Sequence, residues 1–175
     1  MHPFEATMST LTRNWDMVDA AISGMNDAEL SAQPNPHSNS AAWILWHMDR
    51  VLDTFVHQRF RDLPQLWVSD GWAVKFAMPP EPDDRGVGWT AEQVAAWTPP
   101  SREVQLGYHE AIKAATLAYL ESVSEQETMR EIVFPPSPEP RTIASAVAQM
   151  TWDNVAHGGQ IAYIRGYLKG MGWHR

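Results

Sequence analysis

The chain has 175 residues, with 21 acidic side chains against 13 basic ones and a formal net charge of −8. An acidic protein without a basic stripe is predicted to have no nucleic-acid partner, because neutralised phosphates supply most non-specific affinity for nucleic acids. The absence of cysteine excludes disulfides, thiolate metal ligands and a cysteine nucleophile. If thiol chemistry takes place on this protein, a second substrate must bring the thiol.

The hydrophobic share of 44% is typical of a globular protein, and the length suits one domain spanning residues 1–175. No apolar run approaches the ~20 residues that cross a bilayer. The first residues lack the basic-then-apolar order of a secretory signal. We therefore expect a soluble, cytoplasmic protein that acts on a small molecule and has no membrane partner.

Apolar residues recur at helical spacing in four long segments, and no window alternates as a strand would. The predicted helices are, in chain order, residues 5–24, 39–61, 101–123 and 141–169. Ser38 or Asn39 is expected to cap the second helix, and Ser101 the third. Four long amphipathic helices without strands predict an all-α fold, an antiparallel four-helix bundle.

The connections between these helices differ in length and character. Residues 26–39 are polar and contain two prolines, and the segment 134–140 is too rich in proline for a regular helix. Residues 62–100 form a long irregular insertion between helices 2 and 3, with room for short helices at 69–77 and 90–97. A connection of this length in a compact domain is often a lid or a wall of a site.

The fourth predicted helix places two ionisable residues on its apolar stripe. Asp153 and His157 are four residues apart on that face, so their side chains are neighbours, and Gln160 lies at its margin. An unpaired buried carboxylate costs several kcal/mol, so Asp153 must find a partner or a proton. In one interpretation the two residues satisfy each other within an ordinary bundle.

The second helix offers another inward imidazole, because His47 lies at the edge of its apolar side. Asp49 and Asp53 are expected to point from the opposite side into water. Two imidazoles and a carboxylate are a common ligand set for a divalent metal, and three protein ligands leave a position for water or substrate. The alternative interpretation is therefore a metal site built from His47, Asp153 and His157.

Two motifs in these helices are familiar. The segments NSAAWILWHMDRVLD (39–53) and DNVAHGGQIAYIRGYL (153–168) resemble the second-helix and last-helix motifs of the DinB-like (DinB/YfiT) superfamily. DGWAVKF (70–76) and GYHEAI (107–112) resemble stretches of its mycothiol-transferase-like branch. The resemblance implies a four-helix bundle of crossed connectivity that binds one divalent metal.

By position, the resemblance makes His47, Asp153 and His157 the ligands. Many relatives have histidine in place of Asp153, whereas the mycothiol-dependent maleylpyruvate isomerases have an acid there. The implied ion is Zn2+, with Ni2+ as the alternative. The implied co-substrate is a low-molecular-weight thiol such as mycothiol or bacillithiol, and the implied assembly is a homodimer.

The resemblance thus implies a metal-dependent thiol S-transferase or isomerase, in which an activated thiol attacks an electrophilic substrate. A metal-dependent hydrolase on the same site is the first alternative. The second is a non-catalytic binding or stress-response bundle whose metal is structural or absent.

Further side chains are candidates for contacts with substrate. Trp43, Trp46 and Trp72 could wall a pocket or simply pack in the core. Arg50, near His47 on the same helix, could hold a substrate carboxylate or lie exposed in water. His109 could face the site or be partly exposed.

The sequence also allows predictions for four other histidines and for a pair of glycines. His2, His37, His57 and His174 are predicted to lie at the surface or the termini. Gly158 and Gly159, inside the fourth helix, predict close approach of a neighbouring helix or of a ligand, because glycine costs ~1 kcal/mol relative to alanine in a helix.

Overall fold

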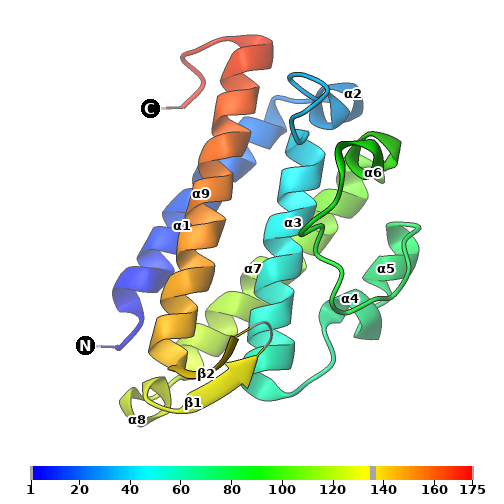
Figure 1. Ribbon diagram of the computed structural model, residues 1–175. Helices are drawn as coiled ribbons and strands as arrows, with labels where there is room; N and C mark the ends of the chain where they lie inside the picture. Colours follow the sequence, from blue (N-terminus) through cyan, green and yellow to red (C-terminus); the bar gives the residue numbers. More distant parts are fainter. Residues whose placement is uncertain (1, 135–136, 175) are drawn as a thin grey trace.

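A computed structural model of the protein describes residues 2–134 and 137–174. Within these residues, four long helices form the bundle shown in Figure 1: α1 (Glu5–Ser23), α3 (Ala41–Asp53), α7 (Arg102–Ser122) and α9 (Ile143–Lys169). α3 continues directly into a π-helical segment, η1 (Thr54–Arg59). The all-α bundle predicted from the periodicity is confirmed.

The order of the helices around the bundle is not a simple up-and-down one. α9 packs mainly against α1 and α3, and α3 also packs against α7. α1 and α9, the first and the last helix, run side by side in the same direction, and so do α3 and α7 (Figure 1). The predicted antiparallel arrangement is therefore wrong for these two pairs. Parallel neighbours cannot be joined by a short turn, so the chain after α3 must return along the whole bundle. The long insertion makes that return.

The insertion is built from short helices: α4 (Leu66–Ser69), α5 (Trp72–Lys75) and α6 (Ala91–Ala96). The last two correspond to the two that were predicted, whereas α4 was not. The side chain of Arg50, on α3, is fully buried and holds the insertion against the bundle. Its guanidinium donates to four oxygens of this segment, those of the Glu81, Pro82 and Asp84 carbonyls and the Gln65 side chain.

Asp53 is the second anchor of the insertion on α3. Its carboxylate accepts hydrogen bonds from the backbone N–H groups of Leu66 and Trp67 and from the Tyr108 hydroxyl, at 2.8–2.9 Å. The His57 Nδ1 lies 2.8 Å from the same carboxylate. The predictions that Asp53 points into water and that His57 is at the surface are wrong, because both are buried partners of this network.

The smaller elements lie at the ends of the bundle. Two short helices, α2 (Asp27–Ser31) and α8 (Glu125–Thr128), and an antiparallel hairpin of β1 (Glu131–Phe134) and β2 (Ser137–Thr142) were not predicted. They are too short to show a hydrophobic period. Ser40, rather than Ser38 or Asn39, caps α3, and Ser101 caps α7 as expected. Over the described ranges, no helix has both the length and the apolar character to cross a bilayer.

Candidate metal centre

Three side chains from two helices converge on one point. His47 comes from α3, and Asp153 and His157 lie one turn apart on α9. Each offers one ligand atom, and the three atoms lie within 4.8 Å of one another. The two imidazole rings are 4.7 Å apart at their centroids and nearly perpendicular, at 82°.

The site lies at the edge of the core and not at its centre. His47 is buried, whereas the side chains of Asp153 and His157 remain 23% and 21% exposed. The expectation that both α9 residues interrupt the buried stripe is therefore correct only in part. Partial exposure would give an ion held here contact with solvent or substrate, which a closed core cluster would not allow.

Hydrogen bonds orient both imidazoles. The Nδ1 of His47 lies 2.5 Å from the Arg85 carbonyl oxygen, and the Nδ1 of His157 lies 2.8 Å from the Gln160 Oε1. Both partners are oxygens that only accept, so each Nδ1 carries the proton and each Nε2 is left with its lone pair. Ligating histidines are commonly held by a hydrogen bond of this type from the other ring nitrogen.

The electrostatics suit a cation. Burial lowers the pKa of His47, which keeps its ring neutral and able to ligate near pH 7. The Asp153 carboxylate, with its Oδ1 3.6 Å from the His157 Nε2, raises the pKa of His157. The other oxygen of Asp153, Oδ2, is inaccessible to solvent and has no hydrogen-bond partner among the described residues. A nitrogen, nitrogen and oxygen donor set with one unsatisfied carboxylate oxygen fits a divalent metal.

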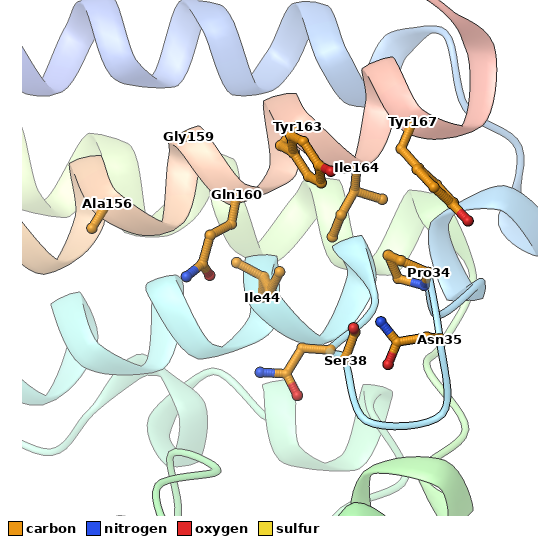
Figure 2. Close-up of a pocket in the computed structure, with 11 residues that line it drawn as sticks. Pro34, Asn35, Ser38, Ile44, Ala156, Gly159, Gln160, Tyr163, Ile164 and Tyr167 are labelled. Carbon is orange, nitrogen blue, oxygen red and sulfur yellow. The ribbon is translucent and has the colours of Figure 1, made fainter.

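Two cavities adjoin this cluster. The smaller, about 200 Å³, is lined by His47 and Asp153 themselves, together with Arg59 and Arg85. The larger, about 630 Å³, lies between α9, α3 and the segment before α3 (Figure 2). Gln160, which holds His157, reaches into the larger cavity. The candidate cluster thus borders the smaller cavity directly and is linked to the larger one through Gln160.

The tryptophans predicted as pocket walls have other positions. Trp43 stacks on the His47 ring, with centroids 5.2 Å apart and planes within 7° of parallel. Trp46 is buried in an aromatic cluster with Trp67, Trp89 and Trp97. Trp72 packs against Tyr108 of α7. None of the three predicted tryptophans lines the two cavities, and Trp43 alone touches the candidate centre.

His109 and Arg50 do not reach the centre either. His109 is fully buried in α7, and its Nδ1 lies 2.7 Å from the Asp49 carboxylate. Asp49, predicted to face water, is buried as well, and burial raises its pKa. The Arg50 guanidinium is fully buried against the insertion. The polar residues of α3 therefore divide between structural anchors and one site residue, His47.

Asn154, which was not predicted as a functional residue, lies at the interface of α1 and α9. It is fully buried, and its Oδ1 accepts hydrogen bonds from the Trp15 indole and the Asn14 amide. Its position next to Asp153 offered a signal, since a residue one step along the helix faces about 100° away, toward α1. Asn154 fixes how α9 is rotated against α1 and so where Asp153 and His157 point.

Comparisons with known proteins agree with this fold. A family model for the DinB superfamily matches residues 10–161, most of the chain. The protein belongs to the DinB superfamily. A search of curated proteins found no match. Among solved structures, this DinB-superfamily chain is similar to a conserved protein of Enterococcus faecalis, with 27% identity and a TM-score of 0.85, over 98% of this chain and 99% of that one.

One glycine of the insertion allows close packing against Trp43, the residue that stacks on His47. Gly86, next to Arg85, has φ +79°, and a Cβ there would lie 2.4 Å from the Trp43 Cζ2 atom. We expect Gly86→Ala to lower the free energy of unfolding by about 2–3 kcal/mol, from backbone strain and the clash together. Gly88→Ala is the matched control, with φ +81° and nothing within 4 Å of a Cβ. Urea unfolding of both variants would measure the difference, and equal losses would contradict tight packing at Trp43.

Proposed function

We propose that this protein is a metal-dependent transferase or isomerase that uses a low-molecular-weight thiol as co-substrate. The observation that carries the proposal is the convergence of His47, Asp153 and His157 beside a cavity that two of them, His47 and Asp153, line. Zn2+ is the proposed ion, with Ni2+ as the alternative. A divalent cation with an open coordination position lowers the pKa of a bound thiol or water and so supplies a nucleophile near neutral pH.

The chain's own residues do the positioning. Arg85, through its carbonyl, and Gln160 fix the two imidazoles with Nε2 toward the shared point. One aspartate among the ligands offsets only part of a divalent charge, which leaves the centre Lewis-acidic. Because the chain has no cysteine, the thiol must come from solution.

The larger cavity supports a polar, uncharged co-substrate. Its wall combines amide and hydroxyl groups of Asn35, Ser38 and Asn39 with the tyrosines 163 and 167, and it contains no charged side chain (Figure 2). Such a wall recognises hydrogen-bonding groups and flat or apolar faces without selecting for charge. A thiol carried on a hydroxyl-rich body suits this space, and Gln160 connects it to His157.

Metal content is the first test. We expect about one equivalent of Zn2+ or Ni2+ per wild-type chain after metal loading and desalting, and loss of tight binding in His157→Ala. The matched control is His37→Ala, because His37 is an exposed histidine that lines neither cavity. Elemental analysis of the three proteins measures this. Stoichiometric metal in His157→Ala, or no binding by the wild type on titration, would contradict the proposal.

A second assay distinguishes thiol transfer from metal-dependent hydrolysis. Loaded protein is given an electrophile with and without an added thiol such as mycothiol or bacillithiol, and thiol consumption is followed. Turnover that requires the thiol supports transfer. Hydrolysis of esters or amides without any thiol would instead assign the site to a metal-dependent hydrolase.

A further inference from the structure

Two arginines from separate segments face the smaller cavity. Arg59 is the last residue of η1, and Arg85 lies in the insertion beside Gly86. Both line the same space of about 200 Å³ as His47 and Asp153. In a chain with an excess of acidic residues, this is a local concentration of positive charge next to the candidate centre.

Arg59 already pairs with Asp83, a carboxylate that does not line the cavity. Asp153 belongs to the candidate metal cluster, where its carboxylate would ligate the cation. Asp83 lies 3.7 Å from the Arg59 guanidinium, but its side chain is 80% exposed. An ion pair so open to water is worth at most about 1 kcal/mol, so an incoming anion can compete for Arg59.

The rest of the cavity wall is largely apolar. Val51, Phe55 and Met150 line it beside the charged and ligand residues. Its volume admits a molecule of only a few carbon atoms beyond the charged group. Guanidinium groups match the planar, two-oxygen geometry of a carboxylate, and the apolar part of the wall suits the carbon chain that a carboxylic acid carries and an inorganic anion lacks.

We infer that this cavity binds a small carboxylic acid, with Arg59 and Arg85 holding its carboxylate and its short carbon chain directed toward His47 and Asp153. The inference rests on the proposed function in one respect, since it names small electrophiles that carry a carboxylate as the substrate class for that centre. It replaces Arg50, the arginine predicted from the sequence for this role, which the structure buries elsewhere.

The test is direct binding of butyrate and of butyramide, which share size and shape and differ in charge. Protein-detected NMR titration of metal-free and Zn2+-loaded protein reports both affinities through the signals of Val51 and Met150. We expect butyrate to bind at least about tenfold more tightly than butyramide, a difference of about 1.4 kcal/mol. The double variant Arg59→Met, Arg85→Met should lose that preference, and Arg85→Lys, which keeps the charge, should retain part of it.

Arg13→Met is the matched control, because Arg13 is an exposed arginine of α1 outside both cavities. It should bind butyrate as the wild type does. Equal affinity for butyrate and butyramide in the wild type would overturn the inference. So would butyrate binding that is lost on removing Zn2+ but unchanged in the arginine double variant.

Metal content separates this inference from the proposed function. An arginine double variant that keeps its metal but no longer binds butyrate supports the carboxylate site. Wild-type protein that binds butyrate through the arginines yet takes up no metal also supports it, while contradicting the proposed function. A double variant with an unchanged melting temperature and unchanged butyrate binding overturns it.

Discussion

Replacing Arg50 by methionine is expected to lower the free energy of unfolding by about 3–5 kcal/mol, the range for breaking a buried charge network on one side. The guanidinium is fully buried and donates to three carbonyl oxygens of the insertion and to Gln65. Methionine fills similar space but leaves those acceptors unpaired. It also removes the guanidinium that lies 3.7 Å from the buried Asp53 carboxylate.

Urea unfolding followed by circular dichroism measures this loss. Arg13→Met serves as the control, since substitution of an exposed arginine usually changes stability by less than about 0.5 kcal/mol. We also expect weaker metal binding by Arg50→Met. The carbonyl of Arg85, which orients His47, follows directly after Asp84, whose carbonyl Arg50 holds. A loss below about 1 kcal/mol would show that the insertion is held by its aromatic contacts and not by Arg50.

The second large effect is expected at adjacent glycines of α9, with opposite signs. A Cβ on Gly158 would lie 2.1 Å from the Asn14 Oδ1 atom, whereas a Cβ on Gly159 meets nothing within 4 Å. Gly158→Ala should therefore destabilise the protein by about 2–4 kcal/mol, because overpacking forces α1 away from α9. Gly159→Ala should stabilise it by about 0.5–1 kcal/mol through helix propensity.

The Asn14 side chain cannot simply rotate away from a new methyl group. Its amide nitrogen donates to the carbonyl and the Oδ1 of Asn154, so movement would leave buried groups unpaired. If this account is correct, the losses in Gly158→Ala and Asn14→Ala will not add in the double variant, because both act on one contact. Thermal unfolding of the four proteins tests this. Additive losses, or a stable Gly158→Ala, would contradict close approach of the helices at this point.

Much of the candidate centre follows from local sequence. The four-residue spacing of Asp153 and His157 places them together on any helix, whatever surrounds it. His47 at the edge of an apolar stripe made a second inward imidazole predictable. His47 meets Asp153 and His157 only because α3 and α9 are neighbours. The periodicity alone does not predict that pairing of helices, whereas the family resemblance implied it.

Local sequence failed for the polar residues of α3 and for the fine rotation of α9. Periodicity assigns Asp49, Asp53 and Arg50 to a polar face, and a polar face is normally solvated. Here that face is covered by α7 and the insertion, and the burial is made tolerable by partners far along the chain, such as His109 and Tyr108. A pattern of one helix carries no information about partners supplied by another.

The sequence by itself therefore determined the four long helices, the all-α class and the residues able to ligate a metal, because each depends on residue type and on spacing within one helix. Only the tertiary structure decided which polar groups are buried, which arginines face the candidate centre and which hold the insertion. Those outcomes depend on which helices are neighbours and in which direction they run. The parallel pairing of α3 with α7 is the physical reason that the insertion exists, and through the insertion Arg85 reaches both His47 and the cavity beside it.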